Sequence, residues 1–420
     1  MTTIPSEAPG CPVRKLEPGG RSTGPGLEQV SNAGGGRWVV RSFDVARQVL
    51  REPEGTAQAG FGAEGLLAGR DGGTESEPRR RRRRRGRAMR PPILYLEGAQ
   101  HRTQRKAAAR FFAPKVTEDY RGMMEAFSDD LVRRIGTDKP VDLSRLSMQM
   151  AVQVAAQVVG LTSSSTRGMS RRLDTFFSRD PLEPPSGPAG WLKMLRSGTA
   201  TARFFWLDVK PAIRARRRQP REDVVSQLLA EGFSDLEILT ECLTYGAAGM
   251  VTTREFICVA AWHLLDDPRL LAQYRDGTLE ERLALLQETL RLEPVVGHLY
   301  RRIQQPLAVT ADGAEQLLPS GALVDLDLRA VNADAATVGA EPYGLCPGRE
   351  LPRSVPPALM SFGDGNHRCP GAPLAIMESE IFLSTLFRHD IVALGPPTVS
   401  WNPVSQGYDL DDFLVTRRAG

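Results

Sequence analysis

Hydrophobic and polar positions divide the chain into a long helical part and a shorter β-rich part. Apolar residues recur at helical spacing from His101 to about Leu292, and clusters of Gly, Pro and Ser interrupt this pattern at 163–166, 181–188 and 219–220. Beyond Pro294 the pattern changes to short β-like runs at 307–309 and 322–328. Before the helical part, residues 37–40 predict a strand and residues 43–51 a helix.

The clearest helix begins after Ser234. Ser234 and Glu237 form a capping box, and apolar residues recur through Leu265. A helix of about 30 residues would be roughly 45 Å long, enough to cross the whole molecule. A second capping box, from Thr278 to Glu281, opens a helix that Pro294 should end.

Three segments lack regular patterning. Residues 1–36 are rich in Gly, Pro, Ser and Glu and predict a flexible N-terminal segment. Residues 60–92 form a low-complexity loop that contains seven consecutive arginines, Arg79 to Arg85. The Pro-rich stretch 333–360 is long for an irregular segment inside a domain, which usually indicates function.

Composition is that of a soluble globular protein, with 41% hydrophobic and 25% charged residues. These values exclude collagen-like, coiled-coil and wholly disordered chains. No run approaches 18 apolar residues and the N-terminus has no signal-like pattern, so we expect a cytoplasmic protein without a membrane partner. The net charge of +4 comes from 54 basic and 50 acidic residues, a near balance that argues against a nucleic-acid partner.

Five cysteines are an odd number, and they are widely spaced. This pattern argues against a disulfide framework or a structural zinc site. Cys369 stands out, because it ends a glycine-punctuated loop that begins at Phe362 and is followed by an amphipathic helix. The helix N-terminus, His367 and Arg368 should lower the pKa of this thiol and make it a thiolate.

Two further patterns accompany the cysteine loop. Glu288 and Arg291 share one helix face, and Arg349, in the irregular stretch before Cys369, is a suitable third member of an ionic cluster. In the middle of the long helix, Ala248 and Gly249 would leave a notch, with the Thr252 hydroxyl nearby.

With these motifs in the right order, the chain resembles cytochrome P450s of the soluble bacterial type over nearly its whole length. The resemblance implies a mainly α fold with a smaller β part, a helical prism enclosing haem between a long distal helix and a proximal cysteine loop. Residues 37–420 would form a single catalytic domain. Haem b would be the cofactor and dioxygen the oxidant.

The resemblance also implies site residues. Cys369 would be the thiolate ligand of the iron, and Phe362, Gly363 and Gly371 would shape its surroundings. The haem propionates would be bound by four side chains: His101, Arg105, Arg301 (or its neighbour Arg302) and His367. Glu288, Arg291 and Arg349 would form a structural triad that supports the proximal side.

The distal helix departs from the family pattern at one position. Ala248, Gly249 and Thr252 match it, but Val251 stands where an acidic residue usually precedes the threonine. In the usual scheme the acid and the threonine pass protons to dioxygen. Glu255 lies one turn further along the helix, beyond easy reach, so hydroxylation follows less directly than haem binding.

Substrate would be lined by regions placed by analogy, which include Tyr245, Val295, Val296, His298 and Leu299. His263 and His389 have no catalytic context and are interpreted as structural. Residues 191–206 could form a membrane-binding helix, but packing of a lid over the core is the better interpretation. The arginine run is either a solvated loop or a charged segment that attracts an anionic or carrier-bound substrate.

The resulting hypothesis is a monooxygenase that inserts one oxygen atom of O₂ into a small organic molecule, in secondary metabolism. Electrons from NAD(P)H would arrive through a separate ferredoxin and ferredoxin reductase, docking on Arg102, Lys106, Arg110 and Arg368. One alternative is an atypical P450 that couples, cyclises or nitrates its substrate without net hydroxylation. A second alternative, a haem sensor or nucleic-acid module built on the arginine run, fits the balanced charge poorly.

Overall fold

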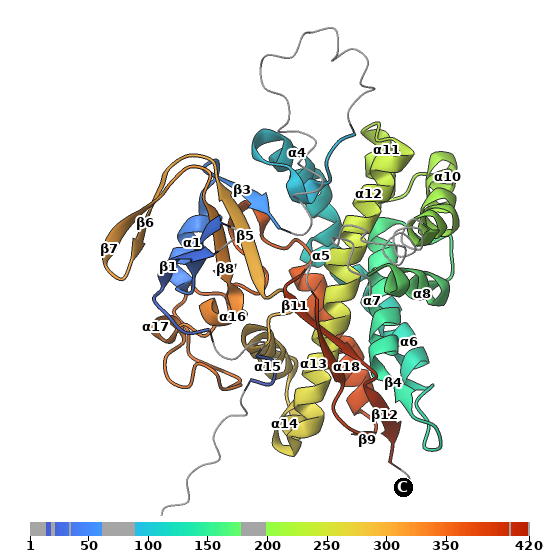
Figure 1. Cartoon of the computed structure of the whole chain (residues 1–420). Coiled ribbons are helices and arrows are strands. Elements are labelled where there is room, and N and C mark those ends of the chain that lie inside the picture. The colour runs from blue at the N-terminus through green and yellow to red at the C-terminus, as the bar shows by residue number, and fades with distance from the viewer. Residues whose placement is uncertain are drawn as a thin grey trace, which may run out of the picture.

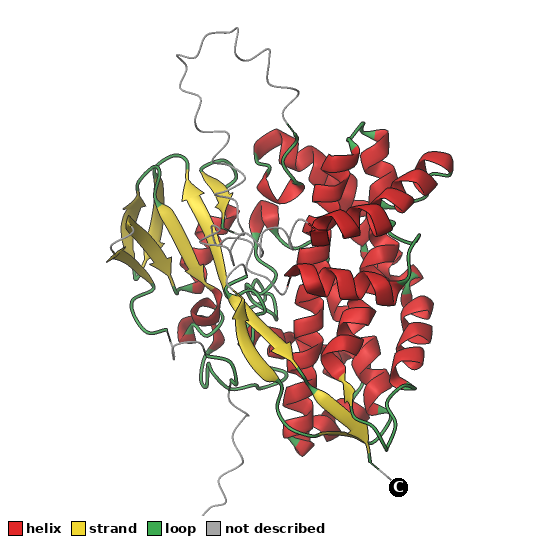
Figure 2. Ribbon diagram, turned by 45° about the vertical axis from the view of Figure 1, so that its right-hand side comes forward, coloured by secondary structure: helices red, strands yellow, loops and turns green. Residues whose placement is uncertain are grey.

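A computed structural model describes residues 14–17, 22–32, 35–60, 89–177, 199–402 and 405–418. Most of the helices gather into one part of the molecule, and the largest sheet lies beside them together with α1 (Phe43–Arg51), α16 (Leu328–Val331) and α17 (Ala335–Val338), as Figures 1 and 2 show. This arrangement confirms the predicted mainly α fold with a smaller β part. The arginine run Arg79 to Arg85 lies outside the described residues, and so do residues 191–198 of the segment 191–206.

The described α-helices follow the predicted periodicity from residue 98 to residue 292, with shorter helices before the cysteine loop and α18 after it. Their bounds are α1 Phe43–Arg51, α4 Gly98–Ala109, α5 Pro114–Asp119, α6 Arg121–Val132, α7 Leu143–Val159, α8 Thr166–Phe177, α10 Lys210–Arg218, α11 Val224–Ala230, α12 Asp235–Tyr245, α13 Thr252–Asp266, α14 Pro268–Asp276, α15 Leu279–Leu292, α16 Leu328–Val331, α17 Ala335–Val338 and α18 Ala372–Phe387.

The described strands form four small sheets. The largest has the order β1-β2-β8-β5-β3, in which β2 and β8 run parallel and the other neighbours antiparallel. The bounds are β1 Leu27–Asn32, β2 Gly35–Val40, β3 Thr56–Ala59, β4 Val141–Asp142, β5 His298–Ile303, β6 Leu307–Ala311, β7 Ala314–Leu318, β8 Leu323–Asp327, β9 Ile391–Ala393, β10 Thr398–Asn402, β11 Gly407–Asp411 and β12 Leu414–Arg417.

The long helix predicted after Ser234 is present but is not uniform. Ser234 caps α12 with the complete capping box, and α13 ends at Asp266. Between them, residues Gly246–Val251 form a π-helical turn. Such turns are rare and often occur at functional sites. The extra residue per turn falls on the small residues Ala248 and Gly249, where the sequence predicted a notch.

The buried apolar side chains of the described residues form two hydrophobic cores. The larger core lies among the helices, where α13 packs on α7 through buried residues such as Met148, Val152 and Ile257. The smaller core lies between α1 and the five-stranded sheet, with Phe43 and Leu326 among its buried side chains. Burial of these apolar faces is the main driving force that places the cysteine loop between the two parts.

The described cysteines are of two kinds. Cys242 and Cys258 are buried free thiols, but Cys346 is disulfide-bonded. One bonded cysteine beside three free ones is not a disulfide framework, so the structure does not contradict the expectation against such a framework.

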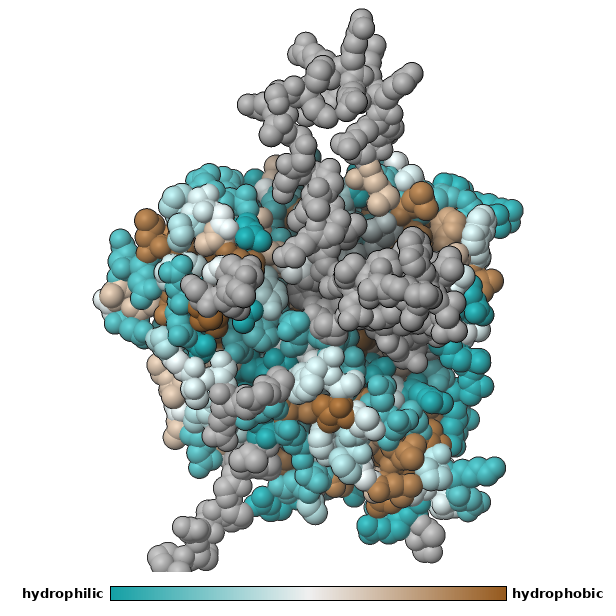
Figure 3. Space-filling model, in the orientation of Figure 1, coloured by the Kyte–Doolittle hydropathy of each residue, from teal (hydrophilic) through white to brown (hydrophobic). Residues whose placement is uncertain are grey.

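The outer surface is mixed. Within the described residues, no helix combines the length and the apolar character needed to cross a bilayer. Figure 3 shows one face, where hydrophilic residues predominate and hydrophobic ones form separate groups. Phe204 is buried in the helical core, whereas Trp206 is 60% exposed. The predicted core packing of this segment is therefore confirmed for Phe204 and wrong for Trp206.

Candidate active site

The cysteine loop connects the irregular stretch to α18. Gly363 and Gly365 have φ angles of +66° and +64°, which glycine adopts without strain. A Cβ on Gly365 would lie 2.0 Å from the carbonyl oxygen of Leu50 in α1, so the loop packs directly on that helix. The N–H of Cys369 donates to the carbonyl of Phe362 at 2.8 Å, which closes the loop.

The electrostatics of the Cys369 thiol differ from the expectation. Burial raises its pKa, and this effect outweighs the lowering by the N–H groups of Gly371 and Ala372 and by the Arg105 and Arg368 charges. The prediction that the helix terminus and nearby cations alone make a thiolate is therefore wrong. A metal cation at the sulfur would supply the missing charge, because a coordinating thiol is deprotonated outright.

The three residues of the expected triad meet in space. Arg291 has no exposed side-chain surface and donates to both oxygens of Glu288, at 2.7 and 2.8 Å. Arg349 donates to the same carboxylate at 3.1 Å, and so does the backbone N–H of Cys346. The remaining guanidinium protons of Arg291 bind the carbonyls of Asn332, Pro342 and Gly344, which fixes the irregular stretch on α15.

The side chains expected to bind the propionates also converge; we call His101, Arg105, Arg301 and His367 the basic cluster. The rings of His101 and His367 stack with centroids 4.1 Å apart. Burial, and next the His367 charge, lower the pKa of His101 to about 4. Arg105 donates to the carbonyl of Arg368 beside the cysteine.

Arg301 is the member of its pair that belongs to the cluster. It is 4% exposed and donates to the side chain of Gln58 in β3, while burial lowers its pKa to about 10. Arg302 points to the other face of β5 and donates to the carbonyl of Gly321. The alternation of side chains along a strand decides between the two.

Glu97 is a member of this site that the sequence analysis missed. Its carboxylate accepts from the Gln58 N–H at 2.6 Å and contacts His367 Nε2 at 3.0 Å. Burial alone would raise the pKa of Glu97, but these hydrogen bonds and the nearby charges lower it overall, so the group is ionised. Its position four residues before His101 was the one available signal.

The distal helix presents open space at its π-helical turn. Ala248 is exposed, and a Cβ on Gly249 would meet nothing within 4 Å. The Thr252 hydroxyl donates to the Ala248 carbonyl at 2.6 Å. Side-chain bonding of this kind supports a bend or bulge in a helix.

Two buried carboxylates near this part of α13, Glu255 and Glu378, have hydrogen-bond partners other than Thr252. Glu255 is buried, accepts from the N–H of Leu410 at 2.8 Å and pairs with Arg254. It points toward β11, as expected from its position one turn beyond Val251. Glu378 in α18 is also buried and hydrogen-bonds Thr253, and burial raises its pKa well above the usual range.

The residues expected near substrate differ in their surroundings. Val295 is buried in the helical core, while Val296 is only partly buried. Leu299 lies over the cysteine loop, since its Cδ1 would be 3.8 Å from a Cβ on Gly363. His298 is held by Asp325, with its Nδ1 2.6 Å from the carboxylate. The structural interpretation of His263 is confirmed by its buried contact with Glu293 at 3.1 Å.

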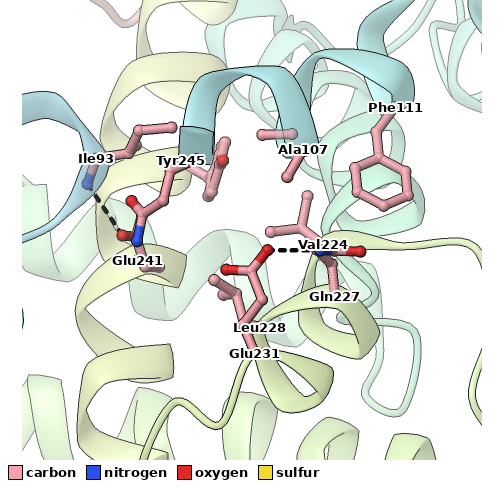
Figure 4. Close-up of a pocket in the computed structure, with 11 residues that line it drawn as sticks. Ile93, Ala107, Phe111, Val224, Gln227, Leu228, Glu231, Glu241 and Tyr245 are labelled. Atoms are coloured by element: carbon pink, nitrogen blue, oxygen red, sulfur yellow. Dashed lines mark hydrogen bonds between the residues drawn. The ribbon is translucent and has the colours of Figure 1, made fainter. Parts of the chain in front are cut away.

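Tyr245 lines a small cavity between α4, α11 and α12, drawn in Figure 4. Its ring stacks on Phe112 with centroids 6.1 Å apart. Glu241 also lines it, and one of its oxygens accepts from the Ile93 N–H at 2.9 Å while the other has no partner among the described residues. Burial raises the pKa of Glu241 to about 7.

The residues present fit a haem. The donor set combines one thiol, two arginines and two histidines, a combination suited to an iron and two carboxylates. Glu97 demonstrates this fit, because its carboxylate is already bound at His367 beside Arg301. On the other side, the open space at Gly249 leaves room next to the distal helix. Fold and site thus define a haem-thiolate protein.

Comparison with known proteins leads to the same class. The cytochrome P450 family model matches residues 283–403, the segment that contains Glu288, Arg291, Arg349 and Cys369. A cyclomarin C epoxidase of Salinispora arenicola is 28% identical over 312 residues, 71% of this chain and 72% of its own. A vitamin D(3) 25-hydroxylase of Pseudonocardia autotrophica is 26% identical over 310 residues, 71% of this chain and 70% of its own.

A solved structure shares the whole fold. P450BioI, in complex with a hexadec-9Z-enoic acid ligated acyl carrier protein, superposes with a TM-score of 0.71 at 21% identity and covers 94% of both chains. The chain belongs to the cytochrome P450 family and is an oxidoreductase similar to bacterial monooxygenases.

Proposed function

We propose that the protein is a monooxygenase that inserts one oxygen atom from O₂ into a small organic substrate. One observation carries the proposal: the thiol of Cys369 and the carboxylate-binding basic cluster lie together, and a π-helical turn beside Thr252 offers open space. When bound, a thiolate-ligated haem activates dioxygen for insertion into C–H or C=C bonds.

Different residues of the protein would bind the haem, support the cysteine loop and form the distal site. Cys369 would hold the iron, His101, Arg105, Arg301 and His367 would bind the propionates, and Phe362, Gly363 and Gly371 would shape the loop around the sulfur. Glu288, Arg291 and Arg349 would keep the irregular stretch in place beneath it. On the distal side, Ala248 and Gly249 would leave space for dioxygen, and the Thr252 hydroxyl would hold a proton near it.

The absorption spectrum of the reduced protein with carbon monoxide tests this assignment first. We expect a strongly red-shifted Soret band in the protein as purified. Cys369→Ser should abolish this band, while Cys258→Ser, at a buried thiol in the middle of α13, should retain it. A wild-type band at the position of histidine-ligated or thiol-ligated haem would contradict thiolate ligation.

We further propose that electrons come from NAD(P)H through a ferredoxin and a ferredoxin reductase. Arg102 and Lys106 are exposed one turn apart on α4, and Arg110 is exposed directly after it. Arg368 is also exposed, and its carbonyl accepts from Arg105 of α4, so four cations offer a docking face to an acidic carrier. Reconstitution of turnover with a purified ferredoxin pair tests this directly.

The substrate would be a small organic molecule of secondary metabolism, either free or bound to a carrier protein. The name of the cyclomarin C epoxidase supports the first form, and the carrier-protein complex of P450BioI supports the second. Binding titrations with free and carrier-linked candidates would separate them. A cytoplasmic location and the absence of a nucleic-acid partner stay predictions from the sequence.

A second candidate function is oxidation without net oxygen insertion, such as coupling, cyclisation or nitration. Val251 favours it, because the position before Thr252 has no acid and Glu255 is bound to β11 instead. Product mass separates the two functions. A gain of one oxygen atom supports the monooxygenase, and a product that has lost hydrogen or gained a nitro group supports the alternative.

A further inference from the structure

Glu97 occupies the helix-capping position of α4 without capping it. Helices usually begin after Ser, Thr, Asp or Asn, whose short side chains accept from the first free N–H groups. The Glu97 side chain makes no such bond to α4. It accepts from the Gln58 N–H at 2.6 Å and contacts His367 Nε2 at 3.0 Å. The contacts of Glu97 therefore belong to the basic cluster.

The surroundings of Glu97 are those expected for a haem propionate. His367, which Glu97 contacts, stacks on buried His101. Arg301 is 4% exposed and donates to the side chain of Gln58. Arg301 and Glu97 therefore both bind Gln58 of β3. The negative charge of Glu97 partly offsets the effect of burial on Arg301, so the two groups are close enough to interact.

Haem b would bring two further carboxylates to the basic cluster. Arg105 and Arg301 are permanent cations, and the two propionates of haem b would neutralise them one for one. Glu97 adds a third carboxylate to the same half-buried site, where salt screens charges less than at the surface. The site would hold one carboxylate more than guanidinium groups.

We propose that Glu97 acts as a third carboxylate of the propionate site and sets the haem potential, favouring the ferric state and loosening the hold on the cofactor. This inference rests on the proposed haem function. Reduction adds one negative charge to the haem, and a fixed carboxylate nearby disfavours that charge. The same charge would repel the propionates, which would share His367 with Glu97.

In an alternative role, Glu97 would only orient His367 so that His367 can bind a propionate. The two roles predict opposite changes. If Glu97 supports His367, its removal should release haem faster. If it competes with the propionates, removal should slow haem release and make reduction easier.

The test uses the full-length, haem-loaded protein and three variants. Glu97→Gln removes the charge and keeps the shape, while Glu97→Ser removes the charge and supplies a good helix cap, so α4 should remain stable. Glu54→Gln is the matched control. Glu54 is 72% exposed, and its carboxylate lies 3.9 Å from the Arg102 guanidinium of α4, the helix that begins after Glu97. The readouts are the ferric/ferrous midpoint potential by spectroelectrochemistry and the rate of haem transfer to excess apomyoglobin.

We expect a higher midpoint potential and slower haem transfer in both Glu97 variants, and wild-type values in Glu54→Gln. Unchanged potentials in the two Glu97 variants would overturn the proposal, and so would faster haem loss or a failure of both variants to retain haem that the wild type retains. A wild-type protein that binds no haem would instead contradict the proposed function, so the two failures are distinguishable.

Discussion

Arg291 donates two hydrogen bonds to Glu288, its neighbour one turn earlier on α15, at 2.7 and 2.8 Å, and its side chain has no exposed surface. Buried ion pairs contribute little net stability compared with apolar residues, but breaking one leaves an uncompensated charge. Because Arg349 and the Cys346 N–H also use the Glu288 carboxylate, one side chain holds α15 to the irregular stretch.

Glu288→Gln should therefore destabilise the protein by about 3–5 kcal/mol, the usual cost of an unpaired buried charge. Urea unfolding followed by circular dichroism measures the loss. Glu280→Gln is the control, since Glu280 lies exposed on the same helix and should change stability by less than about 0.5 kcal/mol. Equal midpoints for the two variants would contradict the structural importance of the triad.

Glu241 predicts a pH dependence of stability. Burial raises its pKa to about 7 from 4.5, so the folded state keeps its proton at higher pH than the unfolded state does. Stability from this group is fully present below about pH 4.5 and is lost as the pH rises through 7, by about 3 kcal/mol. Glu241→Gln should remove this loss between pH 5 and 8.

Chemical denaturation at several pH values measures the difference between wild type and Glu241→Gln. Glu222→Gln, at an exposed position before α11, should follow the wild-type curve. If the difference between wild type and Glu241→Gln stays constant from pH 5 to 8, the Glu241 pKa is not raised.

Gly365→Ala should disturb the cysteine loop more than ordinary backbone strain would. The added Cβ would lie 2.0 Å from the Leu50 carbonyl oxygen, at a φ of +64°. Gly313, in the β6–β7 turn, has a φ of +79° and open space around it, so Gly313→Ala should cost only about 1–2 kcal/mol of strain.

Haem content after purification and the thermal midpoint compare the two variants. We expect Gly313→Ala to retain haem and Gly365→Ala to lose most of it, because α1 and the loop must separate. Full haem retention in Gly365→Ala would show that the contact with Leu50 is dispensable.

Thr252→Ala tests the distal site. The Thr252 hydroxyl is the side-chain donor at the π-helical turn, and its loss should divert reducing equivalents from product to hydrogen peroxide. The ratio of product to NAD(P)H consumed should fall several-fold. Thr240→Ala, which removes an equivalent hydrogen bond to the Leu236 carbonyl in α12, should leave the ratio unchanged. An unchanged ratio in Thr252→Ala would favour the second candidate function.

The proposed docking face predicts a salt effect. Arg102→Glu with Lys106→Glu should slow reduction by an acidic ferredoxin at least tenfold at low ionic strength, because the attraction becomes repulsion. The same exchange at Arg133, an exposed position after α6, should have no effect. Stopped-flow reduction at 20 and 500 mM salt checks this, and salt-independent rates would place the docking site elsewhere.

Local patterns in the sequence were sufficient to predict most of the helices and the cysteine loop. The capping boxes at Ser234 and Thr278 predicted two helix starts that the structure confirms, and Pro294 follows the end of α15 as expected. The cysteine loop was also readable, because a glycine at positive φ and a helix start are encoded within a few residues. The order of these motifs was enough to indicate the family.

Only the tertiary structure decided which distant side chains meet. Glu97 and Gln58 join the basic cluster, Arg301 rather than Arg302 faces it, and burial reverses the expected pKa shift of Cys369. A sequence records spacing along the chain, whereas hydrogen bonds, desolvation and Coulomb interactions depend on distances that arise when α1, α4, β5 and the cysteine loop pack together. For that reason the sequence determined the class of this protein, and the folded arrangement determined the charge and hydrogen bonding of its site.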